Sequence, residues 1–343
     1  MSQQEPEVHD AARTATDSIS NRSEVVFLYD VVDANPNGNP MTEENRPRID
    51  DYTGEVRVTD VRLKRVVRDY LDRRGETILI KASGEEGRDD KDDRYAVLME
   101  EMEPLMDEDG PDMSEEEAFL AVASDVRMFG EAMTFDSPIS HSFTGPVQFN
   151  FGRSMHAVNE SSHGKTSVVA ASSDEDDRAE GGNMFTDYRI DYGLIRFHGV
   201  INEHNASDTH LSDEDVELLS DGLWNGTRYE TNTASKKGHE PRLLVRVEYA
   251  TDDYHVGDLH RSFTFEPDGM DERAMRDISD GVLDATEFVG LLEDHADDIA
   301  SVDVRASRRL RIAVGDVDDG GPFDLEQAMH TPLDPESVAF SVE

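Results

Sequence analysis

The sequence contains no cysteine, only six lysines and no long apolar run. Without cysteine the chain has no disulfide and no Cys-ligated zinc or iron–sulfur cluster. No segment approaches the roughly 20 apolar residues of a membrane-spanning helix, and the first residues lack the basic-then-apolar pattern of a secretory signal. We therefore expect a cytoplasmic protein with no membrane partner and no cofactor or metal.

Negative charge is what the sequence has in excess. Asp and Glu number 77 against 33 Lys and Arg, a formal net charge of -44 over 343 residues. The carboxylates are dispersed along the chain, so they repel one another at ordinary ionic strength. Near ~1 M salt the Debye length falls to about 3 Å, and the repulsion becomes tolerable. The pattern favours the cytoplasm of a salt-accumulating halophile over an acidic mimic of nucleic acid, because a mimic concentrates its carboxylates.

One segment, Arg57–Arg74, reverses this charge with seven basic residues against three acidic ones, a local net of +4. Thr59 is a suitable N-cap and Gly75 a suitable stop for a helix over 60–74. On a helical wheel one face is apolar and the opposite face, with its flank, is basic: Arg62, Lys64, Arg65 and Arg68. The pattern predicts a helix that packs on a sheet and turns a cationic face toward a polyanion. The alternative is a solvated surface paired with the abundant carboxylates.

Periodicity and turn residues predict the other elements. Strands are expected over 24–33, 144–153, 192–202, 241–250 and 259–266, with short β elements finishing the ordered part at Arg311. Further helices are expected over 95–106, 114–128, 212–224 and 271–297. This order is that of an α+β fold, with an RNA-recognition-type (ferredoxin-like) βαββαβ sheet carrying long insertions.

Six segments in order are similar to a known family: DANPNGNP, NRPRIDDYTGEVRVTDVRLKRVVRDYL, DVRMFG, TGPVQFNFGRSMH, YGLIRFHGVIN and NTASKKGHEPRLLVRVEY. Over residues 24–250 the chain resembles the Cas-seven family, the backbone subunit of type I CRISPR interference (Cascade) complexes. It looks most like the subtype I-B (Csh/Csd) members, and its composition suggests a haloarchaeal source.

The resemblance implies a hand-shaped, non-catalytic subunit with an RNA-recognition-type palm, helical fingers and a thumb hairpin. Its parts would be a disordered leader over 1–23, the first half of the palm over 24–80, fingers over 81–135, a palm strand over 136–153, the thumb over 154–191, the second half of the palm with a C-terminal extension over 192–314, and a tail over 315–343.

The resemblance also implies partners. They are CRISPR RNA, target DNA, further copies of the chain in a head-to-tail filament, and the other Cascade subunits, including the 5′-end subunit and the guide-processing endonuclease. The predicted RNA contacts combine basic side chains with amides, which bond phosphate or 2′-OH without net charge. They are Asn35, Asn37, Asn39, Arg46, Arg48, Thr59, Arg62, Lys64, Arg65, Arg68, Arg153, Lys165, Lys236 and Lys237.

Other readings of the motifs are weaker. Target-cleaving relatives use a loop aspartate, so a metal-dependent endoribonuclease acting through Asp33 is the alternative function; Asp33 also suits a cap of the Asn/Pro turn. A general single-strand RNA chaperone is a further option. Gly164-Lys165-Thr166 lacks the first glycine of a phosphate-binding loop, and the acidic run 316–321 lacks key ligands of a calcium loop. His198 is expected to be a packed strand residue.

Overall fold

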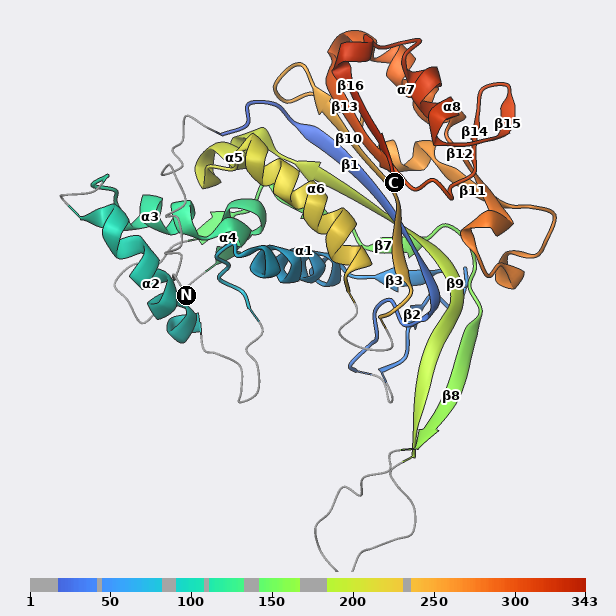
Figure 1. Cartoon of the computed structure of the whole chain (residues 1–343), viewed down its shortest axis with the longest axis horizontal. Coiled ribbons are helices and arrows are strands. Elements are labelled where there is room, and N and C mark those ends of the chain that lie inside the picture. The colour runs from blue at the N-terminus through green and yellow to red at the C-terminus, as the bar shows by residue number, and fades with distance from the viewer. Residues whose placement is uncertain are drawn as a thin grey trace, which may run out of the picture. The chain divides into compact units, whose positions relative to one another are not determined.

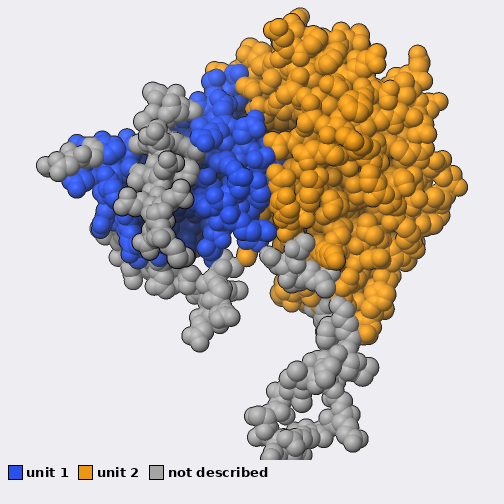
Figure 2. Space-filling model, viewed as in Figure 1, with its two compact units in different colours: residues 1–22, 67–148, 201–222 blue, residues 23–66, 149–200, 223–343 orange. Residues whose placement is uncertain are grey.

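The structure, a computed structural model, describes residues 18–41, 45–81, 91–107, 111–132, 142–166, 184–230 and 236–343 (Figure 1). The chain divides into two compact units (Figure 2). Unit 1 comprises Met1–Arg22, Val67–Gln148 and Ile201–Gly222; unit 2 comprises Ser23–Val66, Phe149–Val200 and Leu223–Glu343. Most of the predicted leader, residues 1–17, lies outside the described residues. Ile19 is described, and its N–H donates to the carbonyl of Leu211 at 2.9 Å.

Eight α-helices occur in the described part of the chain. They are α1 (Asp60–Arg74), α2 (Lys91–Met106), α3 (Glu115–Val122), α4 (Ser124–Phe129), α5 (Glu203–Thr209), α6 (Asp213–Arg228), α7 (Thr286–Asp294) and α8 (Pro322–Met329). As predicted, the Thr59 hydroxyl accepts a hydrogen bond from the Arg62 N–H (3.3 Å), and Gly75 ends α1 with a left-handed φ of 89°. No helix among these residues is long and apolar enough to cross a membrane.

Sixteen strands occur in the same residues. They are β1 (Ser23–Ala34), β2 (Arg48–Ile49), β3 (Val56–Val58), β4 (Gly130–Ala132), β5 (Ser142–Thr144), β6 (Val147–Phe149), β7 (Gly152–Ser154), β8 (Glu160–Thr166), β9 (Met184–Ile201), β10 (His239–Tyr249), β11 (Thr264–Pro267), β12 (Gly281–Asp284), β13 (Ile299–Ala306), β14 (Ile312–Val314), β15 (Val317–Gly320) and β16 (Val338–Val342).

The large sheet has the strand order β16-β13-β10-β1-β9-β7-β3-β2, with β6 and β8 also paired to β9. Strands β1, β9 and β10 are its long members because each is a dense run of β-branched, aromatic and aliphatic residues. Strand β1 pairs antiparallel with β10, and β13 pairs parallel with β16. Two helices connect the four neighbouring strands β10-β1-β9-β7 along the chain. Helix α1 comes between β1 and β7, and α6 comes between β9 and β10.

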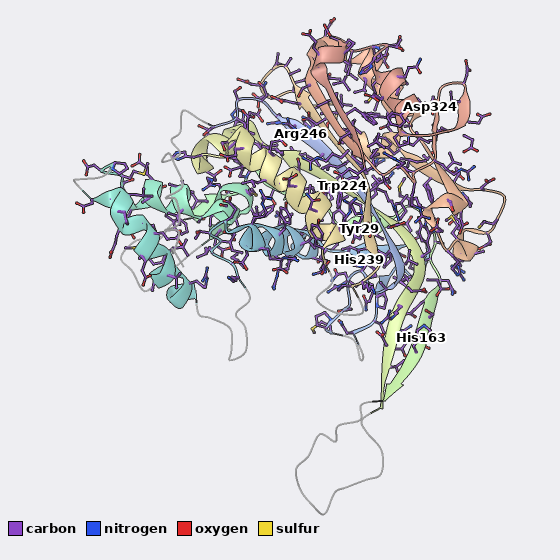
Figure 3. The ribbon with its side chains drawn as sticks, in the orientation of Figure 1. Tyr29, His163, Trp224, His239, Arg246 and Asp324 are labelled. Carbon is purple, nitrogen blue, oxygen red and sulfur yellow. The ribbon has the colours of Figure 1, made fainter. Side chains whose placement is uncertain are left out.

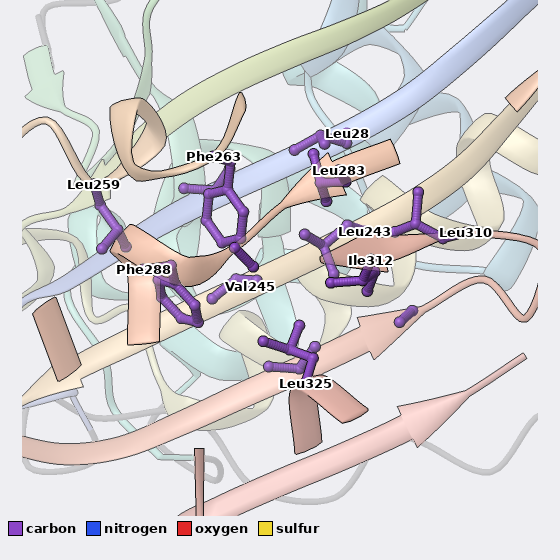
Figure 4. Packing of buried hydrophobic residues seen from close by; sticks show 14 of the residues in the cluster. Leu28, Leu243, Val245, Leu259, Phe263, Leu283, Phe288, Leu310, Ile312 and Leu325 are labelled. Carbon is purple, nitrogen blue, oxygen red and sulfur yellow. The ribbon is translucent and has the colours of Figure 1, made fainter. Parts of the chain in front are cut away.

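The main core of unit 2 lies on one face of this sheet (Figure 4). Leu28 of β1 is directly opposite Leu243 of β10, and both are fully buried. They pack in one cluster with Phe263, Phe288 and Leu325 from the C-terminal elements. Full burial of such a side chain stabilises a fold by about 1.5–3 kcal/mol. Because residues two apart along a strand share a face, the C-terminal elements cover this face of β1, β9 and β10.

Unit 1 has its own apolar cluster, which includes Leu98 and Met102 of α2 and Phe119 of α3. Helix α3 begins with a reciprocal capping box: the Ser114 hydroxyl accepts from the Glu117 N–H (3.3 Å), and the Glu117 carboxylate accepts from the Ser114 N–H (2.9 Å). The two helices predicted between 95 and 128 are therefore present, with the second divided into α3 and α4.

The strand predicted over 144–153 is wrong, because three short strands with different partners occupy this segment. Strand β5 pairs with β4, whereas β7 pairs with β3 and β9. Gly145 follows β5, and a Cβ at that position would lie 2.0 Å from the carbonyl carbon of Phe129. The backbones meet too closely there for a regular strand to continue.

The acidic helix predicted over 271–297 is also wrong. Asp277 caps a short 3-10 turn over Ile278–Asp280, and Gly281 then begins β12, which pairs with β11 and β14. Only Thr286–Asp294 forms an α-helix (α7). Strand pairing with distant residues outweighs the helical periodicity, which is a weak local preference.

Two boundaries also differ from the prediction. Leu259–Ser262 forms a 3-10 turn, and the strand expected over 259–266 begins only at Thr264. The ordered fold continues beyond Arg311: β16 extends the large sheet, and Leu325 and Met329 of α8 belong to the core.

Candidate nucleic-acid interface

The Asn/Pro loop after β1 uses its asparagines to hold its own conformation. The Asn37 Oδ1 atom accepts hydrogen bonds from the Thr59 N–H (2.9 Å) and hydroxyl (3.0 Å), which ties the loop to the start of α1. Asn35 donates to the carbonyl of Asn45 (2.8 Å), and the Asn39 Oδ1 accepts from the N–H two residues later (3.1 Å). Four of the predicted RNA contacts therefore also brace the loop and the helix behind it.

The two predicted loop lysines have different surroundings. Lys236 is half-buried, and its Nζ donates to the backbone carbonyls of Asn35 (2.6 Å) and Pro36 (2.9 Å). Burial, with the nearby charge of Arg62, lowers the pKa of Lys236 to about 7. Lys237 is exposed. Lys236, one of the predicted RNA contacts, therefore holds the Asn/Pro loop in place, whereas Lys237 remains exposed.

Arg62 is likewise directed inward. It forms an ion pair with the buried carboxylate of Glu230, whose other oxygen lies 3.6 Å from the His239 Nδ1. Burial, followed by the charges of Lys236 and Arg62, lowers the pKa of His239 well below its ordinary value, so its ring is neutral. Figure 3 shows Tyr29 and His239 close together, and their rings are 5.6 Å apart.

A small cavity of about 10 Å³, room for about one water molecule, lies among these groups. Its lining comes from β1, α1, α6 and β10, and from Glu230, two residues beyond the end of α6: Tyr29, Arg62, Leu63, Val66, Thr227, Glu230 and His239. Such a volume accommodates no nucleotide, and the cluster is a structural ion-pair network.

The basic face of α1 is only partly open. Arg68 is 8% exposed, donates from Nε to Asp125 (2.8 Å) and lies 5.0 Å from the ring centre of Phe129. Removing one partner of a buried ion pair costs about 3–5 kcal/mol, so Arg68 stabilises unit 1. Its prediction as part of an open cationic face is wrong. Lys64, 3.7 Å from Asp60, and Arg65 are half-buried on the same helix.

The sheet brings together four arginines that lie far apart in sequence. Register pairs Arg48 with Arg57, Arg57 with Arg153, and Arg153 with Arg196, across β2, β3, β7 and β9. Directly opposite residues share a face, with Cβ atoms about 4.5–5.5 Å apart. We call Arg48, Arg57, Arg153 and Arg196 the arginine row. Arg57 pairs with Asp50, and Arg153 lies 3.5 Å from Glu55.

The arginine row and the first half of α1 occupy opposite faces of the sheet. Phe197, the neighbour of Arg196, has its ring 6.3 Å from that of Tyr29, and a Cβ on Gly152 would lie 2.4 Å from the Phe197 ring. Tyr29 lines the same cavity as Leu63 of α1, so α1 packs on the Phe197 face. Successive strand residues alternate between faces, so Arg196 lies on the other one.

Two members of the row, Arg57 and Arg196, are not among the residues predicted from the sequence. The available signal was local: Val56-Arg57-Val58 and Ile195-Arg196-Phe197 each place one arginine between two buried apolar residues. That pattern predicts a strand with one open face. It gives no information on which strands are neighbours.

The β8–β9 ribbon projects from the sheet, with His163 on its outer part (Figures 1 and 3). Its strands pair from Glu160 opposite Ile190 to Thr166 opposite Met184. Arg46, a predicted RNA contact, donates from Nε to Glu160 (3.2 Å) and lies 4.6 Å from the ring centre of Tyr188. Arg46 thus ties the ribbon to the Asn/Pro loop. Residues 167–183 and the side chain of the predicted contact Lys165 lie outside the described part.

Asp33, the residue before the last of β1, has a left-handed φ of 46° and is exposed, and its carbonyl accepts a hydrogen bond from Arg189 (2.6 Å). It belongs to no group of three metal-binding side chains within the described ranges. His198 is half-buried in β9, 2.8 Å from Glu24. Burial alone would raise the pKa of Glu24, but hydrogen bonds from His198, Tyr249 and the Gly257 N–H lower it to about 2.

The two motifs set aside in the sequence have ordinary surroundings. Gly164-Lys165-Thr166 lies within strand β8, paired with Met184–Thr186 of β9, whereas a phosphate-binding loop lies between a strand and a helix. In the acidic run near β15, Asp319 accepts from Arg311 at 2.8 Å.

The chain is similar to proteins of one known family. The family model of CRISPR-associated protein Cas7 matches residues 21–286. The chain is 38% identical over 313 residues to the CRISPR-associated protein Cas7 of Haloferax volcanii, covering 86% of this chain and 90% of that protein. Similar solved structures include a chain of a CRISPR RNA-guided surveillance complex (TM-score 0.46, 13% identity, 83% of this chain and 88% of that chain) and one of a pre-nicking form (0.47, 13%, 83% and 92%).

Proposed function

Because the chain belongs to the CRISPR-associated protein Cas7 family, we propose that it is a non-catalytic, RNA-binding backbone subunit of a CRISPR RNA-guided surveillance complex. The observation that carries this proposal is the family match, since residues 21–286 include every RNA contact predicted from the sequence. The protein would hold the guide, and base pairing would read the target.

More specifically, we propose that the complex is a type I Cascade of subtype I-B. Several copies would polymerise head-to-tail along a CRISPR RNA, protect its spacer and present it to target DNA. Such a filament needs a heterologous interface that does not close on itself. Its further partners would be the 5′-end subunit and the endonuclease that processes the guide precursor.

The strand arrangement supports the proposed palm. The neighbours β10-β1-β9-β7, with α1 and α6 placed between them in sequence, follow the order of a ferredoxin-like βαββαβ sheet. Within this proposal α2, α3 and α4 form the fingers, and the β8–β9 ribbon is the base of the thumb over 154–191.

The proposed guide contacts are Lys64 and Arg65 of α1 together with the exposed Lys237. These cations would bind phosphates, which position RNA without reading its sequence. Within this proposal Lys236 and Arg62 support the site without binding RNA themselves. Lys236 holds the Asn/Pro loop in place, and Arg62 forms an ion pair with Glu230.

We expect Lys64→Gln with Arg65→Gln to reduce the RNA that copurifies with the assembled complex at molar KCl by at least fivefold. The matched control is Arg73→Gln with Arg74→Gln, which removes two charges from the exposed last turn of the same helix. Circular dichroism of each variant establishes that it is folded, and sequencing identifies the RNA.

Two results would overturn the proposal. Random transcripts in the purified complex would indicate a general RNA chaperone. Regular cuts in a complementary RNA with Mg²⁺, abolished by Asp33→Ala, would instead assign an endoribonuclease.

A further inference from the structure

The arginine row concentrates positive charge in a chain of net charge -44. Its four guanidinium groups have two carboxylate ion-pair partners in the described structure, Asp50 and Glu55. Like charges directly opposite one another destabilise a sheet, and these two carboxylates balance only part of the charge of the four arginines. Neighbouring strands are about 4.8 Å apart, so the row extends over about 14 Å across four strands.

The row also retains hydrogen-bond donors. The Nε atoms of Arg48 and Arg57 are buried and donate to no group within the described ranges. The side chains of Arg57 and Arg153 are 42% and 53% exposed, whereas Arg196 is anchored by a hydrogen bond to the Phe263 carbonyl (2.7 Å). A planar guanidinium fork matches two oxygens of a phosphate and is more weakly hydrated than an ammonium group.

Aromatic side chains flank the row on both sides. Tyr52, in the β2–β3 turn, is 99% exposed, and the turn is fixed because the Asp50 carboxylate accepts from the Tyr52 N–H (2.9 Å). Phe151, just before β7, is 55% exposed. Since β3 and β7 are antiparallel, these two residues lie at opposite ends of the strands that carry the row. Single exposed rings are common, but rings beside a line of arginines are what stacked bases require.

We propose that the arginine row is a second nucleic-acid track, in which the phosphates of a single strand lie across β2, β3, β7 and β9 and bases stack on Tyr52 or Phe151. It is separate from Lys64 and Arg65, because the row and the first half of α1 lie on opposite faces of the sheet. The C-terminal elements cover the rest of this face, which confines the strand to the β9–β2 side. Ring stacking favours a nucleic acid over the acidic surface of a second copy.

The test uses the full chain, stripped of RNA by nuclease, and fluorescence anisotropy of short unstructured RNA and DNA oligonucleotides over the KCl range in which the protein is folded. Each single-strand phosphate contact contributes about 0.7 to the slope of log affinity against log salt. Arg57→Gln with Arg153→Gln should therefore weaken binding and reduce the magnitude of that slope by about 1.4. Tyr52→Ala should weaken binding about tenfold for the ordinary strand but not for an abasic one.

The matched control is Arg308→Gln with Arg309→Gln, two exposed arginines that follow β13, a strand separated from the row by β10 and β1. Equal affinity and slope for the row and control variants would overturn the inference. So would a row variant that loses self-association in sedimentation while its oligonucleotide binding is unchanged, since the row would then bind another copy. Because the oligonucleotides are not guides, the outcome is independent of whether a CRISPR RNA copurifies.

Discussion

At Lys236 the fold places a lysine against two backbone carbonyls and close to a second cation, Arg62. Its pKa of about 7 lies below the ordinary 10.5 because burial disfavours the charged form. Between these values the unfolded chain binds a proton that the folded chain has released. Stability therefore rises with pH over that window, because releasing this proton on folding costs less free energy at higher pH.

We expect Lys236→Met to flatten the rise in the free energy of unfolding between about pH 7 and 10. The measurement is denaturant unfolding at several pH values and constant molar KCl. Lys237→Met is the control, because it removes the exposed neighbouring lysine and should keep the slope. If both variants retain the wild-type slope, Lys236 is not the titrating group.

At the scale of elements, strand pairing decides segments whose local pattern is ambiguous. Residues 271–297 have helical periodicity, yet Gly281 lies in β12, where a Cβ would approach the Phe265 ring to 2.4 Å and the Glu266 carbonyl oxygen to 2.9 Å. Gly290, nine residues later, lies in α7 with no atom within 4 Å of such a Cβ. A side chain at position 281 would therefore clash with its neighbours, whereas a side chain at position 290 has open space.

Gly281→Ala should destabilise the protein by about 1–3 kcal/mol through overpacking. Gly290→Ala should instead stabilise it by about 0.5–1 kcal/mol, since glycine is unfavourable inside a helix. Denaturant midpoints of the two variants provide the comparison. Stabilisation by both substitutions would mean that the whole segment is one helix.

At the scale of the whole molecule, the excess of carboxylates sets the conditions for folding. Several arginines form buried ion pairs, such as Arg127 with Asp215 (2.9 Å) and Arg242 with Asp30 (2.9 Å). These arginines do little to reduce the repulsion between carboxylates on the surface of the protein. Salt has to supply that screening.

We expect the melting temperature to rise steadily as KCl increases from dilute buffer to the molar range, and the chain to unfold on transfer to low salt. Circular dichroism melts over a KCl series measure this, and an equivalent series in sucrose controls for general exclusion effects. A melting temperature indifferent to KCl would contradict the halophilic interpretation.

Local chemistry by itself determined β1, β10, most of β9 and the helices α1 and α6, because apolar periodicity and caps such as Thr59 act over a few residues. Composition identified the basic segment, and the resemblance of six sequence segments indicated the family. The tertiary structure alone decided which cations are available. Arg62 and Arg68 are paired with Glu230 and Asp125, far away in sequence, while strand register aligns Arg57 and Arg196 with two predicted contacts. Burial, ion pairing and register depend on which distant residues meet, and no local pattern contains that information.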